Sequence, residues 1–406
     1  MNNEELILKS EKELESIFKE IDKNTLINSK KVLDAFHKYS FSESDLNQTV
    51  GYGYNDQGRD KLDQIFAYIF DAESAIVRNQ FISGSHAITI ALQGVLRPND
   101  TLLAISGTPY DTLHEVIGIK PNNSSLMSFN VNYKQIDLID NDFDYEKIKE
   151  AVKENIKLIH IQRSRGYSLR DSLTIDKIEK VIKVIREINK DVKIFIDNCY
   201  CEFVETTSPI CVGANLIAGS LIKNLGAGIA TNGAYIAGDE DLVNLCAERL
   251  TVPGEGREVG PSQGANRNIA LGLYMAPKVV SEALKIAILT SKVLEEKGLK
   301  TTPKYNDKRA DIVQLIYFNN KEQLIDYAVS IQHSGAVDSH VSPTPSPMPG
   351  YDNDIIMSSP SFTQGSSIEL SCDGPIREPL VLFQQGSLTY EYGKIAILNA
   401  LNKLDK

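Results

Sequence analysis

The sequence has no tryptophan, and only five of its 406 residues are cysteines. An odd and small number of cysteines argues against a disulfide framework and favours a reducing compartment. Cys199 and Cys201 form a C-x-C pair, but no second Cys or His pair stands at the spacing of a zinc site. We therefore expect no metal site.

Long apolar runs and basic blocks are missing as well. No stretch approaches the roughly 20 apolar residues that a membrane span needs, and residues 1–20 are charged where a secretory signal is apolar. A net charge of −11 argues against a nucleic-acid partner. The composition predicts a cytoplasmic globular protein with a small-molecule ligand, long enough for one large domain and a smaller one.

Motifs for dinucleotide, nucleotide and metal chemistry are also absent. Gly226 and Gly228 resemble the start of a dinucleotide fingerprint, but Thr231 stands where the third glycine belongs. There is no P-loop, and the six histidines show no metal-ligand spacing. These classes of enzyme are therefore excluded.

Hydrophobic patterning predicts an α/β fold. Residues 4–21 have the spacing of an amphipathic helix, which we interpret as an N-terminal arm. Short apolar runs then alternate with helical segments; the predicted strands are SAIVRNQF, TLLAIS, KLIHIQ, KIFIDN and NLIAGS. Such alternation predicts a mainly parallel central sheet with helices on both faces.

Three units follow from this pattern. We predict a helical arm at residues 1–55, a large domain at 56–277 and a smaller C-terminal α/β domain at 278–406, which begins with a long helix after Pro277. Ligands of such folds bind beyond the carboxyl ends of the strands. The polar clusters described below all follow predicted strands.

The first cluster is Ser83-Gly84-Ser85, between an apolar strand and a helix. Unpaired N–H groups in the first turn of a helix bind phosphate or carboxylate. Gly84 lets the backbone approach a ligand closely, and Ser85 caps the helix or donates its hydroxyl. A serine cap without any ligand is the alternative interpretation.

The second cluster pairs Asp197 with Lys223. Asp197 ends an apolar strand, and Lys223 follows another one, so both side chains are expected at one crevice. A buried carboxylate needs a cationic partner, either an arginine or helix terminus or the protonated ring nitrogen of a cofactor. A desolvated lysine can form a Schiff base, whereas a structural ion pair is the alternative.

Together these features match the requirements of pyridoxal phosphate: a phosphate cradle, an Asp for the ring nitrogen and a Lys for the aldehyde. Tyr110, after the next predicted strand, is placed to stack on the ring. The order of these residues along the chain is that of pyridoxal enzymes with the aminotransferase-like fold, known as fold type I.

Long blocks of the sequence resemble a bacterial family described as methionine gamma-lyase-like or aluminium-resistance proteins, related to the cystathionine lyases. The resemblance runs from about residue 20 to the end of the chain. The blocks that carry it are GYGYNDQGRDKL, SGSHAITIALQGVLRPND, GTPYDTLHEVIG, IQRSRGYSLR, IDNCYCEFVE, AGSLIKN, RLTVPGEGREVG and ELSCDGPIREP.

The resemblance implies a role for each site residue. Lys223 would hold the cofactor aldehyde and act in catalysis with Tyr110, the stacking ring, while Asp197 would pair with the ring nitrogen. The phosphate would be held by Gly84, Ser85 and Ser220. In this family a Tyr and an Arg reach the cofactor of a neighbouring subunit; Tyr54 and Arg59 match them, with Tyr52 as second choice for the tyrosine.

Substrate contacts follow from the same resemblance. Arg377 would clamp the substrate carboxylate, although an inter-domain salt bridge is the alternative. Tyr54 would also contact the substrate and take part in catalysis. Arg163, chosen over Arg165, would contact the cofactor or the substrate. A shared site implies a homodimer or homotetramer.

Two positions depart from the family pattern. Ile222 has no hydroxyl where cystathionine-type lyases carry Ser or Thr, so one phosphate contact must come from elsewhere. Cys201 stands where the family has Gly, and we interpret its thiol as a small apolar filler. These departures weaken the transfer of an exact substrate.

The resulting functional hypothesis is a pyridoxal-phosphate carbon–sulfur lyase that eliminates a thiol from an amino acid of the methionine or cystathionine type. The sequence leaves open whether the β or the γ carbon loses the thiol. One alternative is another type of pyridoxal-phosphate enzyme, an aldolase or a transaminase. The other alternative is a protein that binds the cofactor with little turnover.

Overall fold

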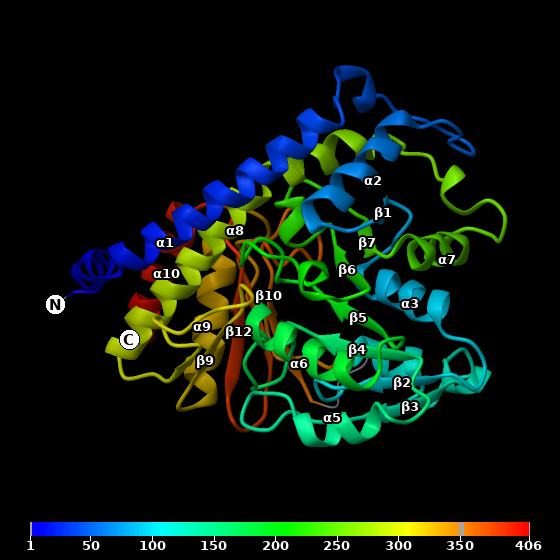
Figure 1. The fold of residues 1–406 in the computed structure, drawn as a ribbon. Coiled ribbons are helices and arrows are strands. Elements are labelled where there is room, and N and C mark those ends of the chain that lie inside the picture. The colour runs from blue at the N-terminus through cyan, green and yellow to red at the C-terminus, as the bar shows by residue number, and fades with distance from the viewer. Residues whose placement is uncertain (1, 349–352, 406) are drawn as a thin grey trace.

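Two β-sheets organise the chain, which a computed structural model describes at residues 2–348 and 353–405 (Figure 1). The larger sheet of this described part has seven strands in the order β1-β7-β6-β5-β4-β2-β3. They are β1 (Ser74–Arg78), β2 (Thr101–Ala104), β3 (Asn132–Gln135), β4 (Leu158–Gln162), β5 (Lys193–Asp197), β6 (Leu216–Ser220) and β7 (Ala234–Gly238). Strand β7 is antiparallel to β1 and β6, and the other neighbouring pairs are parallel. The predicted mainly parallel sheet is confirmed.

Helices cover both faces of this sheet, so its central strands are buried on both sides and read as continuous apolar runs. Helices α3 (Gly84–Val95) and α7 (Glu240–Leu250) pack on one face. Helices α2 (Gln57–Phe70) and α6 (Ile175–Ile188) pack on the other. In α6 the buried residues recur every three or four positions, which gives the helix one apolar face. The shorter helices α4 (His114–Ile117) and α5 (Tyr145–Ala151) complete this domain.

The N-terminal helix α1 (Asn3–Lys38) is longer than the predicted segment 4–21. It begins at a capping box, in which the Asn2 side chain accepts from the Glu5 amide and the Glu5 side chain accepts from the Asn2 amide. It lies along helix α8 (Ala265–Glu296) over much of its length (Figure 1). Its first half packs in the core of the C-terminal region, while Val32 and Ala35 pack in the core of the large domain. Helix α1 therefore bridges both regions.

Helix α8 continues through Pro277, so the long helix starts before the proline and not after it. A proline inside a helix removes one backbone hydrogen bond. Burial of most of α8 between α1 and the two sheets compensates for this loss. The boundary drawn between residues 277 and 278 thus falls within a helix, and the division into three units stays a prediction.

The smaller sheet belongs to the C-terminal region, and its neighbouring strands are antiparallel in the order β10-β11-β12-β9-β8. They are β8 (Thr301–Thr302), β9 (Gln314–Tyr317), β10 (Ile355–Ser358), β11 (Ser371–Pro375) and β12 (Val381–Gln385). Helices α9 (Lys321–Ser334) and α10 (Tyr390–Leu404) pack together against it. The predicted smaller C-terminal α/β region is confirmed. No helix in the described ranges combines the length and the apolar character needed to cross a membrane.

Candidate active site

Strand ends bring the predicted site residues to one edge of the large sheet. Gln162 ends β4 and lies opposite Asp197 at the end of the parallel strand β5. Asp197 in turn lies opposite Ala218 of β6, and Ser220 ends that strand. Lys223 follows three residues later. The crevice expected beyond the carboxyl ends of the strands therefore contains both members of the predicted Lys–Asp pair.

Lys223 and Asp197 compensate for each other's burial. Asp197 is 4% exposed, and its Oδ1 accepts a hydrogen bond of 3.1 Å from the Cys199 amide. Burial raises the pKa of Asp197, and the positive charge of Lys223 opposes this shift. Burial lowers the pKa of Lys223, but the acidic groups around it, Cys199 and Tyr200 and then Asp197 and Glu202, outweigh burial and raise it. The Lys223 ammonium also lies 4.1 Å from the centroid of the Tyr200 ring.

The start of helix α3 forms the expected cradle for an anion. Ser83 caps this helix by accepting from the His86 amide at 3.1 Å, so the capping role belongs to Ser83 and not to Ser85. The amides of the first helical turn have no partner within the helix and point beyond its N-terminus. A Cβ placed on Gly84 would lie 3.1 Å from the Ser220 Cβ and 3.4 Å from the Cys199 Sγ. Gly84 and Ser220 thus face each other across a space that a side chain would fill.

Hydroxyl groups extend this cradle. The Ser85 Oγ lies 2.7 Å from the Thr112 Oγ1, which the sequence did not single out. The Ser220 Oγ accepts from the Ile222 amide at 3.3 Å, so Ile222 contributes a backbone group where its side chain has no hydroxyl. First-turn amides, hydroxyls, a lysine amine and a buried carboxylate at one strand edge fit pyridoxal phosphate, whose phosphate, aldehyde and ring nitrogen need these groups.

Substituting valine for Gly84 is expected to weaken the binding of pyridoxal phosphate by about tenfold or more, because overpacking costs about 1–3 kcal/mol. A titration of the cofactor-free protein, followed by visible absorbance, measures this loss. Ser85→Ala is the matched control, since it keeps the backbone donors of the same turn and should cost less. Wild-type affinity in Gly84→Val would contradict the cradle.

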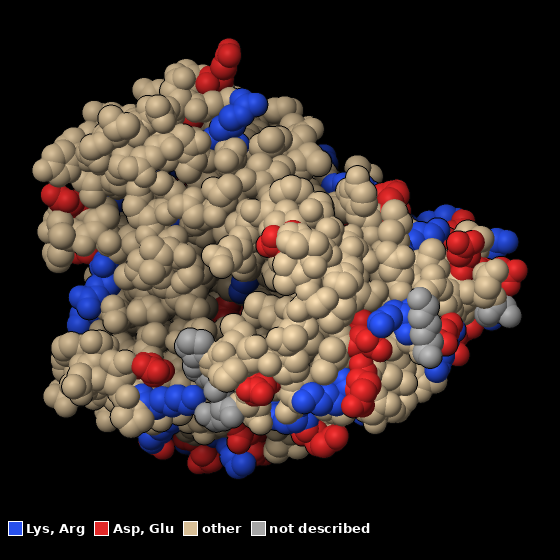
Figure 2. Space-filling view, turned by 180° about the vertical axis from the view of Figure 1, so that it is seen from behind, with Lys and Arg blue, Asp and Glu red and all other residues tan. Residues whose placement is uncertain are grey.

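Tyr110 lines a pocket of about 470 Å³, which also includes Gln162, the residue opposite Asp197 in the sheet. Its ring centroid lies 6.2 Å from that of Tyr167, at an interplanar angle of 43°. The pocket is also lined by the end of β4, by the loop that follows it and by the loop after β11; among these residues are Gln162, Arg165, Tyr167, Arg170 and Arg377. Arg377 is exposed and belongs to the C-terminal region, as a residue that closes on a substrate carboxylate would. Figure 2 shows a hollow in the middle of one face, with basic and acidic side chains at its floor.

Arg163 does not line this pocket. It is fully buried and donates from Nε to the Leu173 carbonyl at 3.1 Å and from Nη1 to the Asn198 Oδ1 at 3.0 Å. Its Nη2 forms an ion pair with Glu205. The choice of Arg163 over Arg165 is therefore not supported by the geometry: Arg163 braces the loop after β5, and Arg165 is the one that reaches the Tyr110 pocket.

The segment with Tyr52, Tyr54 and Arg59 lies apart from the Lys223 cradle within one chain. The two tyrosines are 68% and 56% exposed, and their rings stack with centroids 5.5 Å apart. Arg59 is buried, and its Nη1 donates to the carbonyls of Gly53 at 2.8 Å and Gly260 at 3.0 Å. The exposed tyrosines remain available to a neighbouring subunit. Arg59 instead fixes the shape of its own loop, and its role as a phosphate ligand stays a prediction.

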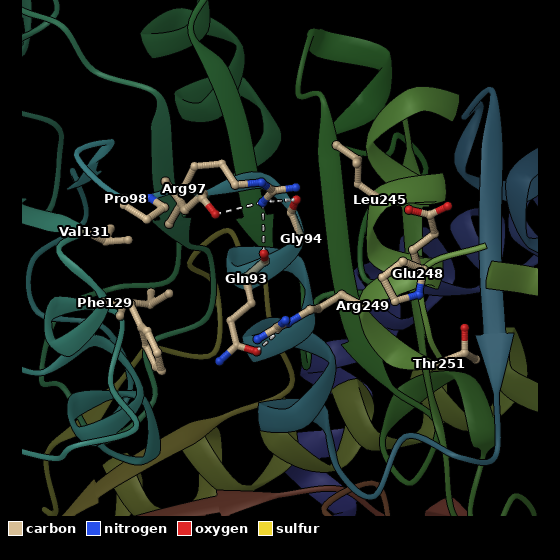
Figure 3. A pocket seen from close by; sticks show the side chains of 13 residues that line it. Gln93, Gly94, Arg97, Pro98, Phe129, Val131, Leu245, Glu248, Arg249 and Thr251 are labelled. Atoms are coloured by element: carbon tan, nitrogen blue, oxygen red, sulfur yellow. Dashed lines mark hydrogen bonds between the residues drawn. The ribbon is translucent and has the colours of Figure 1, made fainter. Parts of the chain in front are cut away.

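A separate surface pocket of about 380 Å³ lies between the end of α3 and α7 (Figure 3). Arg97 points back to the carbonyl groups at the end of α3, and the Arg249 Nε donates to the Gln93 Oε1 at 3.2 Å (Figure 3). None of the predicted site residues lines this pocket. In the part of the chain that the structure describes, no group of three His, Cys, Asp or Glu side chains could hold a metal ion.

Comparisons with known proteins place the chain in one family. A family model described as methionine gamma-lyase matches residues 3–405. The uncharacterized protein YnbB of Bacillus subtilis is 44% identical over 98% of this chain and 97% of its own length. A crystal structure of a carbon-sulfur lyase involved in aluminum resistance from Clostridium novyi NT is 46% identical, with a TM-score of 0.95 over 98% of this chain and 95% of that one.

A more distant structure bears on the fold alone. The pyridoxal-5'-phosphate dependent protein YhfS from Escherichia coli has a TM-score of 0.65 and 17% identity, over 95% of this chain and 96% of that one. The predicted fold type I, with its mainly parallel sheet, is thereby confirmed.

Proposed function

The chain belongs to the methionine gamma-lyase family, and from this premise we propose that it is a pyridoxal-phosphate-dependent carbon–sulfur lyase, which releases a thiol from an amino acid of the methionine or cystathionine type. The observation that carries the proposal is that Asp197 and Lys223 follow neighbouring strands at the same sheet edge at which Gly84 faces Ser220. The name of the Clostridium novyi relative supports the same reaction class.

When bound, pyridoxal phosphate supplies an aldehyde that takes up amines and a ring that accepts an electron pair. The Lys223 Nζ would hold the aldehyde, and Asp197 would keep a proton at the ring nitrogen. The first turn of α3 and the Ser220 hydroxyl would hold the phosphate. Tyr110 would cover the ring and exclude water from one side.

The chain's own residues also handle the substrate and its protons. Arg377 would orient the substrate through its carboxylate. The Lys223 amine, once free, would take the proton from the substrate α-carbon, for which it must be neutral. With one water consumed to release ammonia, the products would be a thiol, a 2-oxo acid and ammonia.

Borohydride reduction tests the cofactor assignment. The purified protein should absorb visible light and lose that absorbance on reduction, and mass mapping should then place the reduced cofactor on the peptide that contains Lys223. Thiol and oxo acid are then measured with methionine, cystathionine and cysteine. Turnover of threonine, or of an amino-group acceptor, in place of these substrates would indicate the aldolase or transaminase. Cofactor attachment without any product would indicate a binding protein.

We also propose a homodimer or homotetramer in which Tyr54 completes the site of a neighbouring subunit. The exposure of Tyr52 and Tyr54 supports this arrangement. When Lys223→Ala and Tyr54→Phe chains are co-expressed, mixed dimers have one intact site, so roughly a quarter of the wild-type activity should return. Each variant alone is the control. Failure of the mixture to exceed both variants would contradict a shared site.

A further inference from the structure

Glu202 is a buried acid next to Lys223 that no step above uses. It is 2% exposed, and its Oε1 accepts from the Tyr235 hydroxyl at 2.9 Å. The backbone carbonyl of Glu202 accepts from the Asn224 Nδ2 at 2.9 Å, which connects Glu202 to the residue directly after Lys223. Its Oε2 is buried and has no hydrogen-bond partner in the described residues.

The neighbouring strands are built around this carboxyl group. A Cβ placed on Gly219 of β6 would lie 2.3 Å from the Glu202 Oε1 and 2.7 Å from the Tyr235 hydroxyl, so a side chain at position 219 would displace the pair. The Tyr235 hydroxyl accepts from the Asn198 Nδ2 at 3.3 Å and therefore directs its own proton to Glu202. Glycine at position 219 thus leaves the room that the Glu202–Tyr235 pair occupies beside β6.

One hydroxyl donor is too little to stabilise a buried carboxylate. Burial raises the pKa of Glu202 to about 7, against the opposing effects of Tyr235 and Lys223, while the charge of Asp197 adds to the rise. The other titratable groups at this cluster include Cys199, Tyr200 and Tyr235, and burial raises the pKa of the Cys199 thiol and of the Tyr235 hydroxyl far above neutrality. Burial thus raises the pKa of both Asp197 and Glu202, and the negative charge of each raises the pKa of Lys223.

We propose that Glu202 is a positioning residue that sets the charge of the Lys223 amine from beneath, without touching substrate or cofactor. This inference rests on the proposed function. While Glu202 holds its proton, Asp197 is the one carboxylate that acts on Lys223. When Glu202 releases that proton to solvent, a second negative charge holds Lys223 as an ammonium, which cannot take a proton from the substrate.

The charge of Lys223 can be read in the cofactor-free protein. The rate at which an amine-acylating reagent labels Lys223, followed by mass spectrometry across pH, reports the neutral amine. Glu202→Gln keeps an oxygen that accepts from Tyr235 but removes the charge, so the apparent pKa of Lys223 should fall by about one unit or more. At a given pH above 7 the labelling rate should then rise about tenfold. Glu205→Gln, three residues on and paired with Arg163, is the matched control and should leave the rate unchanged.

Thermal stability gives a second reading. The pKa of Glu202, raised from 4.5 to about 7, means that its protonated form stabilises the fold below about pH 4.5 and that this stabilisation is lost as the pH rises through 7. Between pH 5 and pH 8 the melting temperature of the wild type should therefore fall relative to that of Glu202→Gln, whereas Glu205→Gln should follow the wild type.

Unchanged labelling and parallel melting curves in Glu202→Gln would overturn the inference. If that variant does not fold, Tyr235→Phe serves instead: loss of the hydroxyl donor should raise the pKa of Glu202 and move the pH step in Lys223 labelling upward, and an unmoved step would overturn the inference. Borohydride reduction tests the proposed function separately. If it fails to fix the cofactor to wild-type Lys223, the proposed function is wrong. The acylation of Lys223 is measured without cofactor, so its outcome does not depend on that result.

Discussion

Lys223→Ala is expected to lower the turnover of any sulfur amino acid by about 10³-fold or more, since a positioned acid–base group alone contributes about 10²–10⁴-fold. The same substitution removes the amine that would hold the cofactor aldehyde. The cofactor should therefore bind without covalent attachment, and borohydride should no longer fix it to the chain. Steady-state kinetics and intact mass after reduction measure the two effects.

Lys223→Arg separates chemistry from electrostatics. Arginine keeps a positive charge beside Asp197, so the fold should retain its stability, but its guanidinium neither forms the covalent link nor accepts a proton at neutral pH. A small added amine should restore part of the turnover of Lys223→Ala, because it replaces the missing base. Turnover within tenfold of wild type in both variants would contradict the assignment of Lys223.

The sequence alone was sufficient to predict those site residues whose charge stands at the end of an apolar run. Lys223 ends an apolar run and Asp197 ends another, and each charge needs a partner where it is buried. Parallel strands align their carboxyl ends, so the strand pattern alone placed the two residues at one edge. The structure agrees, because Asp197 lies one strand away from Ser220, which precedes Lys223.

The sequence could not predict which way a side chain points once the chain has left a strand and entered a loop. Arg163 and Arg165 both follow β4, but the Arg163 amide bonds to the Asp197 carbonyl, and the chain turns there. Alternation of side chains along a strand no longer applies beyond that point. Arg163 therefore lines a small recess with Asn198 and Glu205, whereas the equally buried Arg165 reaches the pocket of Tyr110.

Other features leave no pattern in the sequence. Thr112 and Glu202 join the site through contacts with residues 27 and 33 positions away, to Ser85 and Tyr235. Strand β3 is short, polar and mostly exposed at the sheet edge, so it has no apolar run. In each case the contact that defines the role is tertiary, and local patterning does not encode it.

Asp197→Asn is expected to lower turnover by about 10²–10³-fold, which lies within the range of about 10²–10⁴-fold that a group holding a catalytic proton contributes. Asparagine keeps the shape of the side chain and can still accept from the Cys199 amide. It has no negative charge, however, to hold a proton at the cofactor ring nitrogen. Turnover and the pH dependence of the cofactor absorbance should therefore change together.

The cofactor-free protein should respond to Asp197→Asn in a different way from the loaded one. Without the carboxylate, the partly buried Lys223 ammonium loses one of the negative groups that compensate for its burial, so the melting temperature of the cofactor-free variant should fall. A cofactor aldehyde held by Lys223 would take up this amine, so the loaded variant should lose less. The double variant Asp197→Asn, Lys223→Met removes both charges and should recover stability in the cofactor-free state. Additive losses in the double variant would show that the two side chains do not interact.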